Sequence, residues 1–242
     1  MTTFSTVLRD LLARDAGRPL VTFYDDATGE RVELSATTYA NWVSKAAGLL
    51  VEECDLERGQ SLRIDLPTHW LGPVFLGAAW TIGLVVTAHD EPDAVVCGPG
   101  TLAEWAPRAS DLPVLACSLL PLGVRFADGV PSGVHDVGTE IWGQPDAFTA
   151  WDPPGPDDPA TDSLTQADLF GPTRATAAGG SLLTDGGRLL TTANPASPPG
   201  AAAFTEPLVR RGSVVLVAGA DPARLDALYA EERATARELT RS

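Results

Sequence analysis

Three histidines, His69, His89 and His135, are the residues whose type best suits acid–base or metal chemistry. Their spacing never places two imidazoles on one helical turn, the arrangement in which helical zinc sites hold their metal. His89 stands directly before Asp90 and Glu91 after an apolar stretch, and strand ends of this kind often carry the sites of α/β proteins. We interpret this triplet as a solvated loop and predict no catalytic residue among the histidines.

An acidic pair, Asp157 and Asp158, offers carboxylate oxygens of the kind that Mg²⁺ binds. The pair lies in the segment 151–162, WDPPGPDDPATD, whose prolines and acidic residues are more typical of a linker or an exposed loop. The sequence also lacks the G-x-S-x-G elbow of α/β-hydrolases. We therefore predict no bound metal and no cofactor.

The cysteines and the N-terminus indicate the compartment. Cys54, Cys97 and Cys117 stand far apart and are odd in number, which favours reduced, buried thiols over a disulfide framework. The first residues, MTTFSTVLRDLLARD, show no basic start followed by an apolar core, so no signal peptide is expected. We predict a cytoplasmic protein.

Charge and hydropathy exclude two classes of partner. Of 242 residues, 32 are acidic and 17 are Lys or Arg, which gives a net charge of −15 and disfavours binding to nucleic acid or to an anionic membrane. Residues 70–88 carry no charge, but glycines and a proline interrupt them and a β-branched run ends them. This pattern predicts a buried helix followed by a buried strand, not a membrane span.

Periodicity predicts the elements that would position any site. The first half shows an amphipathic helix over 4–12, a hairpin over 21–34, a helix from Ser35 to about Cys54 with Ser35 as its N-cap, and a short helix over 102–108. Buried strands are predicted over 62–66, 84–87, 94–97 and 114–117. Because strands alternate with helices, we expect an α/β fold with a mainly parallel sheet covered on both faces.

The second half is less regular. Residues 119–150 have weak periodicity, and after the acidic segment we predict a helix over 164–178 capped by Ser163. Strands over 188–192 and 213–219 flank a helix over 201–209, and a helix over 221–239 begins with Asp221 as its N-cap and Pro222. We expect a single domain over 1–242, with possible sub-lobes 1–150 and 163–242 joined by 151–162.

A family resemblance covers most of the chain. Residues 29–88, with Thr38-Tyr39, the Gly59 to Pro67 element and the Gly83 to Val86 strand, resemble the N-terminal region of adenylate-forming enzymes: acyl-CoA synthetases, luciferases and nonribosomal-peptide adenylation domains. GGRLLTTANP (186–195) and the stretch 206–235 resemble later segments of that family in the same order. The chain most resembles a small uncharacterised actinobacterial group related to these ligases.

The departures from the family bear on function. Its ATP-binding loop, T-S-G-S-T-G-x-P-K-G, should fall between residues 158 and 163, where this chain reads DPATDS. The glycines of 175–181 are followed by no cation, so we interpret them as a helix C-cap. Pro198 stands where the family has a histidine, and the later catalytic motifs would lie beyond Ser242. The resemblance therefore implies a ligase relative without the groups that stabilise a pentavalent phosphate.

We accordingly predict a non-catalytic binding or accessory protein whose ligand the sequence does not identify. The alternative is a divergent enzyme acting on a nucleotide or acyl substrate, possibly completed by a partner chain. Trp42, Trp70 and Trp80 are interpreted as core side chains, not as an aromatic cage for a ligand. The apolar strand Ser213 to Gly219 is expected to form an exposed edge or surface that a homodimer or a partner protein covers.

Overall fold

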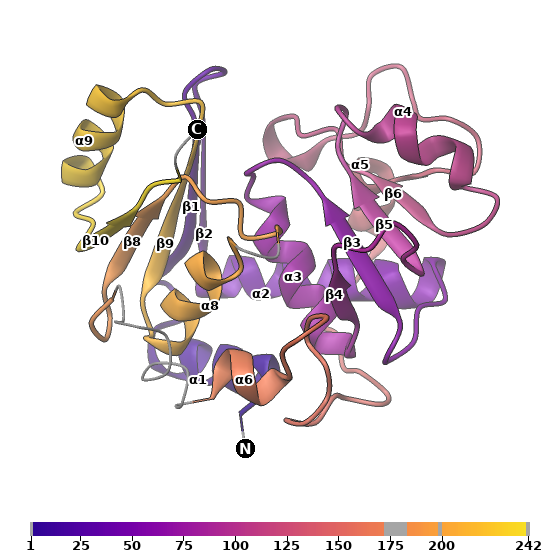
Figure 1. Cartoon of the computed structure of the whole chain (residues 1–242), viewed down its shortest axis with the longest axis horizontal. Helices are drawn as coiled ribbons and strands as arrows, with labels where there is room; N and C mark the ends of the chain where they lie inside the picture. The colour runs from indigo at the N-terminus through magenta and orange to yellow at the C-terminus, as the bar shows by residue number, and fades with distance from the viewer. Residues whose placement is uncertain (1, 172–182, 198–199, 241–242) are drawn as a thin grey trace.

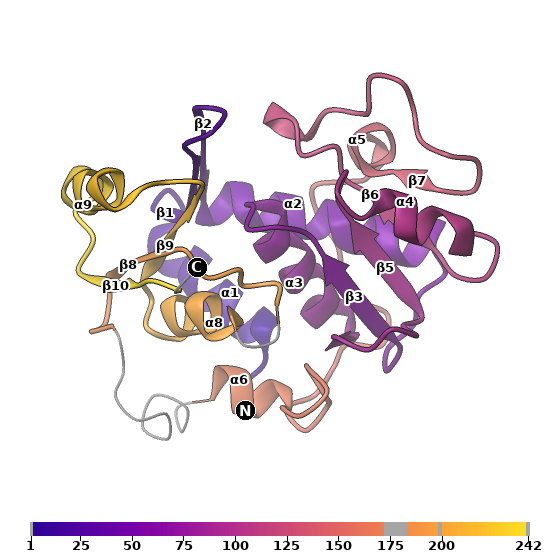
Figure 2. The ribbon, with the colours of Figure 1, turned by 45° about the horizontal axis from the view of Figure 1, so that its top comes forward.

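Two five-stranded sheets face each other across a middle layer of helices (Figure 1). The computed structural model describes residues 2–171, 183–197 and 200–240. Turning the molecule shows α2 and α3 running between the sheets, with further helices outside them (Figure 2). The predicted α/β class with helices on both faces of parallel strands is confirmed, although the strands form two sheets instead of one.

Sheet A joins the two ends of the chain. Its strand order is β10 (Ala236–Glu238), β8 (Arg188–Thr191), β9 (Ser213–Ala218), β1 (Pro19–Asp25) and β2 (Glu30–Ser35). β1 and β2 form the predicted antiparallel hairpin, and the other neighbours are parallel. The division into sub-lobes 1–150 and 163–242 therefore does not coincide with the sheets.

Sheet B is parallel throughout. Its order is β4 (Val85–Thr87), β3 (Ser61–Asp65), β5 (Ala94–Cys97), β6 (Val114–Ala116) and β7 (His135–Asp136). The first four strands confirm the sequence-based assignments to within a residue or two. β7 is only two residues long, so the sequence around it carries no period-2 signal.

The middle layer is built on two helices that pack together. α2 (Ala36–Gly48), capped by the Ser35 hydroxyl as predicted, continues as a π-helical turn over Leu49–Glu53 and contacts α3 (Leu71–Ile82). A Cβ at Gly77 of α3 would lie 2.3 Å from the Tyr39 hydroxyl and 2.7 Å from Val43, so only glycine permits this approach. The uncharged stretch 70–88 is thus the predicted buried helix and strand. Among the described residues, no helix is both long and apolar enough to cross a membrane.

Three more helices surround this layer. α1 (Phe4–Asp15), α6 (Gln166–Phe170) and α8 (Ala202–Val209) lie together at the lower side of Figure 1. α6 corrects the predicted helix over 164–178. Its N-cap is Thr165 in a capping box with Asp168, not Ser163, and its C-cap is Gly171. The rest of that predicted helix, and the glycines of 175–181, lie outside the described residues.

Successive side chains of the central strands point to opposite faces of the sheet and pack into two different hydrophobic cores. In sheet A, Val214 and Leu216 of β9 face the middle layer, whereas Val215 and Val217 face outward against α9 (Pro222–Glu231). The expectation that Ser213 to Gly219 is an exposed edge is wrong, because β9 lies between β8 and β1 and this chain covers both of its faces. This strand therefore does not support the predicted homodimer or partner protein, and that association stays a prediction.

Sheet B is covered in the same way. Its outward-facing side chains pack on Trp105 of α4 (Leu102–Trp105), which continues into a 3-10 turn over Ala106–Arg108. The irregular part of the chain contributes short helices: Pro121–Gly123, α5 (Val137–Glu140) and Ile141–Gly143.

The last helix is shorter than its sequence predicts. α9 begins as expected, with the Asp221 side chain accepting from the backbone N–H of Arg224. It ends at Glu231 instead of residue 239, because Arg233 takes a left-handed conformation (φ 51°) that no α-helix accommodates. The chain then turns back to pair as β10 with β8.

Candidate functional site

Residues 158–163, where the resemblance predicts a phosphate loop, are bound to sheet B. Thr161 forms a parallel bridge with Val86, and the Val86 backbone N–H donates to the Ala160 carbonyl at 3.1 Å. The indole N–H of Trp80 donates to that same carbonyl at 3.0 Å. The segment therefore extends the sheet beyond β4, and its backbone is engaged by protein groups.

Asp158 is held by an arginine. One terminal nitrogen of Arg58 donates to both carboxylate oxygens at 2.8 Å, and the other donates to Asp152 at 2.9 Å. The Arg58 guanidinium keeps the pKa of Asp158 below its ordinary value, although partial burial opposes this effect. Asp157 is exposed. Within the described ranges, no group of three His, Cys, Asp or Glu side chains is arranged to hold a metal ion.

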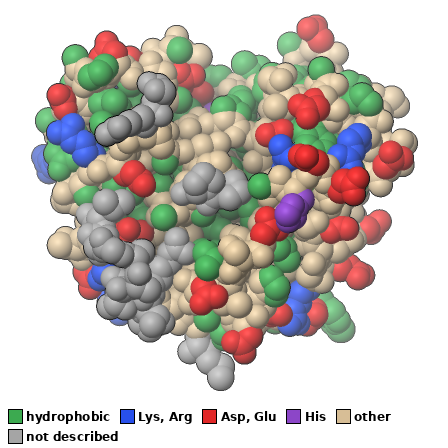
Figure 3. Space-filling view, viewed as in Figure 1, with side chains coloured by type: hydrophobic (Ala, Val, Ile, Leu, Met, Phe, Trp, Pro, Cys, Tyr) green, Lys and Arg blue, Asp and Glu red, His purple; other side chains and the backbone are tan. Residues whose placement is uncertain are grey.

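The neighbouring end of β4 carries carboxylates. Asp162 accepts from the Thr87 hydroxyl at 3.0 Å, and its other oxygen lies 3.6 Å from Nε2 of His89. The nearby cation Arg63 is bound to Asp90 at 2.7 Å. His89 itself is 77% exposed, in agreement with a surface loop. Figure 3 shows acidic side chains over much of the visible face on the sheet B side.

The other two histidines lie in unrelated surroundings. His69 is buried edge-to-face against Phe23, with ring centroids 4.8 Å apart, and burial lowers the pKa of its imidazole to about 4. It is therefore neutral at pH 7. His135 lies 2.9 Å from the Glu140 carboxylate, on the far strand of sheet B. The structure assembles no site from the three histidines.

The cysteines confirm the prediction of buried thiols. All three are free, and burial raises the pKa of Cys54 and of Cys97 to about 12 and that of Cys117 well above its usual value. Because the thiolate is the reactive form, these groups are not nucleophiles at neutral pH.

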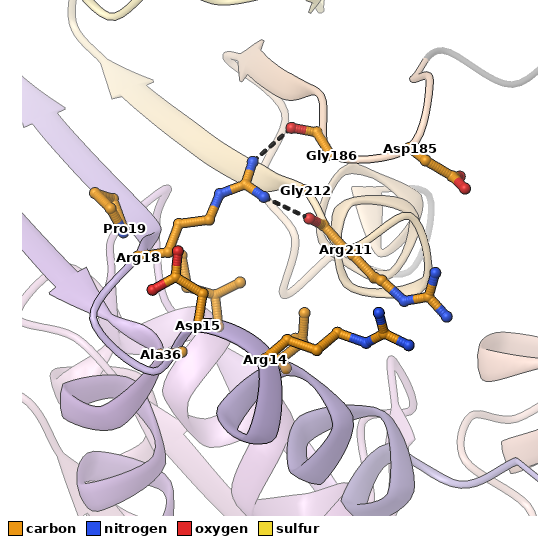
Figure 4. Close-up of a pocket in the computed structure, with 11 residues that line it drawn as sticks. Arg14, Asp15, Arg18, Pro19, Ala36, Asp185, Gly186, Arg211 and Gly212 are labelled. Carbon is orange, nitrogen blue, oxygen red and sulfur yellow. Dashed lines mark hydrogen bonds between the residues drawn. The ribbon is translucent and has the colours of Figure 1, made fainter.

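An arginine-lined pocket lies where the end of α1 meets the start of β1 in sheet A (Figure 4). Its volume is about 290 Å³. Arg18 donates to the carbonyl oxygens of Arg211 (2.9 Å) and Gly186 (2.5 Å), and no carboxylate of the described residues pairs with it. The apolar part of the wall comes from Leu11, Pro19, Leu20 and Ala36.

Two further guanidiniums share one carboxylate beside this pocket. The Nε atoms of Arg14 and Arg211 both donate to Asp10, at 3.0 and 3.1 Å, and these bonds hold the pKa of Asp10 below its usual value. Their outer N–H groups have no partner among the described residues, and Figure 4 shows the two side-chain ends approaching each other. The arrangement suits a small anion with an apolar part. No pattern in the sequence predicts this pocket, because the pairing of β1 with β9 brings residues 14–18 and 211 together only in the folded sheet.

The tryptophans divide into two groups. Trp70 and Trp80 are buried, which confirms the core interpretation for both. Trp42 is only partly buried, and its ring lies against Trp142 at the surface. The sequence interpretation missed Trp142 because the stretch around it has no periodicity.

Comparison with known proteins shows one sequence relative at high coverage. No family model matches the chain. The "TIGR03089 family protein" of Mycobacterium tuberculosis (strain ATCC 25618 / H37Rv) is 36% identical over 243 residues, which cover 97% of each protein.

Solved structures show the fold. An acyl-CoA synthetase of Brucella canis superposes with a TM-score of 0.79 at 15% identity, over 98% of this chain and 47% of that one. The coronafacic acid ligase of Pectobacterium brasiliense superposes with a TM-score of 0.76 at 15% identity, over 99% of this chain and 50% of that one. For a benzoate CoA ligase from Burkholderia xenovorans LB400 the TM-score is 0.70 at 17% identity, over 96% of this chain and 48% of that one. The chain spans about half the length of these ligases, and its resemblance to their N-terminal lobe is confirmed.

Proposed function

Because the chain belongs to the TIGR03089 family and has the fold of the N-terminal lobe of an adenylate-forming ligase, we propose that it is a non-catalytic binding or accessory protein. The observation that carries this proposal is the state of residues 158–163. Their carbonyl and carboxylate groups are engaged by Trp80, Arg58 and Thr87.

A triphosphate needs the opposite chemistry. Phosphate loops present backbone N–H groups and a lysine to the ligand. Here the segment adds the charge of Asp162 to that of the neighbouring Asp90, and the arginines at hand, Arg58 and Arg63, are already paired with carboxylates. Like charges at this edge oppose both the binding of ATP and the charge that develops during adenylate formation.

ATP–pyrophosphate exchange tests the proposal directly. The purified protein is incubated with ATP, Mg²⁺, labelled pyrophosphate and a panel of aliphatic and aromatic carboxylic acids. We expect no exchange above that of the heat-denatured protein. The proposal would be overturned by robust exchange that disappears on denaturation. The exchange activity would also have to follow the amount of this protein across chromatographic fractions.

The second candidate is a divergent enzyme for a nucleotide or acyl substrate, possibly completed by a partner chain. The arginine-lined pocket favours it, because Arg14, Arg18 and Arg211 offer guanidinium N–H groups to a phosphate or carboxylate. ATP, AMP and CoA should then each be tested for a rise in melting temperature. A rise that Arg18→Gln abolishes and Arg108→Gln leaves intact would favour this candidate.

Location and association are part of the proposal. The free, buried cysteines support a reducing compartment such as the cytoplasm. An accessory role implies a partner protein or a second copy of the chain, on a surface other than β9. Sedimentation of the purified protein at micromolar concentration tests for self-association, and recovery in the membrane fraction after a high-salt wash would contradict the location.

A further inference from the structure

Exposed apolar side chains gather in one place. Among the described residues, six large apolar side chains are more than 40% exposed, and four of them are Leu120, Leu122 (72%), Val124 and Trp142. Leu122 and Trp142 line the same cavity. Such a concentration is unusual where nothing binds, because scattered single residues are the normal pattern on a protein surface.

The cavity is walled by tryptophans. It has a volume of about 470 Å³, within the range of small-molecule sites. Trp42 stands nearly perpendicular to Trp70 (73°, centroids 4.9 Å apart) and to Trp142 (68°, 5.4 Å). The Trp42 ring thus makes edge-to-face contacts with two other indoles, and the three rings form a corner. A flat ligand in this corner can contact the face of one ring and the edge of another.

A strained loop closes one side of the cavity. Leu122 has φ 64°, and the adjoining Gly123 has φ 63°. The loop is held by the Ser118 hydroxyl, which donates to the Val124 carbonyl, and by the Gly123 N–H, which donates to the Leu120 carbonyl at 3.0 Å. A left-handed leucine costs free energy, and here the result is an apolar side chain in water. The fold gains nothing visible from this arrangement, whereas a ligand in the cavity would cover it.

The charges at the rim cancel. Lys45 pairs with Asp146 at 3.0 Å and also donates to the Gln144 carbonyl. Arg31 pairs with Glu33 at 2.6 Å and with Glu232 at 3.2 Å. Each cation already has a carboxylate, so the cavity offers no uncompensated charge to a ligand.

One polar group remains available. The side-chain amide of Asn41 lines the cavity and has no hydrogen-bond partner among the described residues. It can donate to and accept from a ligand hydroxyl or carbonyl group.

We propose that this cavity, the tryptophan pocket, binds an uncharged aromatic or cyclic apolar molecule whose polar group bonds to Asn41. The inference rests on the proposed function in that it supplies the ligand site of a binding protein. It does not involve ATP, so its failure would leave the exchange experiment and its conclusion untouched.

Three probes with one ring system and different charges test the class of ligand. They are 2-naphthylmethanol, 2-naphthoate and 2-naphthylmethylammonium, titrated calorimetrically into the protein of residues 1–242 at pH 7. The alcohol should bind at least about fivefold more tightly than either ion. An ion loses its hydration in the cavity, and every opposite charge at the rim is already paired within the protein. Saturable binding of the alcohol should be detectable at concentrations up to about 1 mM.

Variants test the place. Trp142→Ala should weaken binding of the alcohol at least about tenfold. Trp142→Phe, which keeps a ring, should lose much less, and Asn41→Ala should weaken the alcohol more than it weakens 2-methylnaphthalene. The matched control is Trp151→Ala, because Trp151 is fully exposed and lies outside the cavity. Melting temperatures verify that each variant is folded.

The contrary results are distinct. Absence of saturable binding by the folded wild-type protein would overturn the site. An ion that binds as tightly as the alcohol would overturn the assignment to uncharged ligands. Equal affinity in wild type and in folded Trp142→Ala would overturn the location.

Discussion

Arg58 is the residue that fastens the acidic segment to the body of the protein. Its guanidinium bonds to Asp158 and Asp152, and a Cβ at Gly83 would lie 2.8 Å from its Cγ. A single arginine stem thus packs against the end of α3 while its charged end holds two carboxylates. This pairing and the Trp80 bond act on the same short stretch, so both the carboxylate of Asp158 and the carbonyl of Ala160 are engaged by protein groups.

The Asp158 pairing should appear in the pH dependence of stability. The pKa of Asp158 is lowered in the folded state, so its contribution is present above the unfolded pKa and is lost as pH falls through the folded value. Asp158→Asn should therefore lower the free energy of unfolding at pH 7, and the difference from wild type should shrink below about pH 4. Urea unfolding at several pH values measures this. Asp157→Asn, at the exposed neighbour, should change little, and an equal effect of the two variants would contradict the assignment.

Leu122 should show a trade between stability and binding. Replacing it by glycine removes the left-handed strain, partly offset by the greater entropy of the unfolded chain, so Leu122→Gly should stabilise the fold by about 0.5–1 kcal/mol. The same change should weaken binding in the tryptophan pocket. Leu120→Gly is the matched control, since Leu120 has φ −80° and no strain to relieve. Chemical denaturation of both variants provides the measurement, and a destabilised Leu122→Gly would show that the leucine supports the fold.

Central strands are the elements on which this fold depends most. β9 pairs with β8 and β1, and its side chains enter cores on both faces. Val215→Lys places a charge in the outer core, where it has no partner, and should cost more than about 4 kcal/mol, which approaches the whole stability of many domains. Leu239→Lys, at a 43% exposed leucine, should be nearly neutral. Soluble, folded Val215→Lys with an unchanged melting temperature would contradict the position of β9.

Sequence patterns located these elements but not their neighbours. Apolar runs such as AVVC and SVVLVAG predict buried strands because a strand covered on both faces has no polar side. An apolar run does not predict which other strand it pairs with in the sheet. The exposed edge expected at 213–219 was wrong because β1, from the other end of the chain, completes the sheet beside it.

The candidate sites were harder to predict for the same reason. The tryptophan pocket combines Trp42 of α2 with Trp142 from a stretch that has no periodicity, and the arginine-lined pocket combines the end of α1 with residue 211. Local chemistry was predictable where one residue decides it, as with the caps Ser35 and Asp221. Sites made by distant segments leave no spacing to recognise.

The whole molecule is tied together through its two ends. Sheet A takes β1 and β2 from the first 35 residues and β8, β9 and β10 from residues after 187. In the middle layer α2 contacts sheet A, α3 contacts sheet B, and the two helices contact each other, while α1 lies beside α8. A cut in the acidic segment 151–162 therefore separates strands that belong to one sheet.

Fragments test whether the chain is one folding unit. Residues 163–242 expressed alone should lack cooperative structure, because β9 would expose the edge that β1 covers and the face that the middle layer buries. Co-expressed with 1–150, the same fragment should be recovered in a folded complex. Circular dichroism and thermal melting distinguish the two cases, with the intact chain as reference. Val215→Lys in the C-terminal fragment should abolish recovery of the complex, whereas Leu239→Lys should not. A sharp melting transition in isolated 163–242 would instead establish it as an independent sub-lobe, and β1 would then be an addition to a sheet that folds without it.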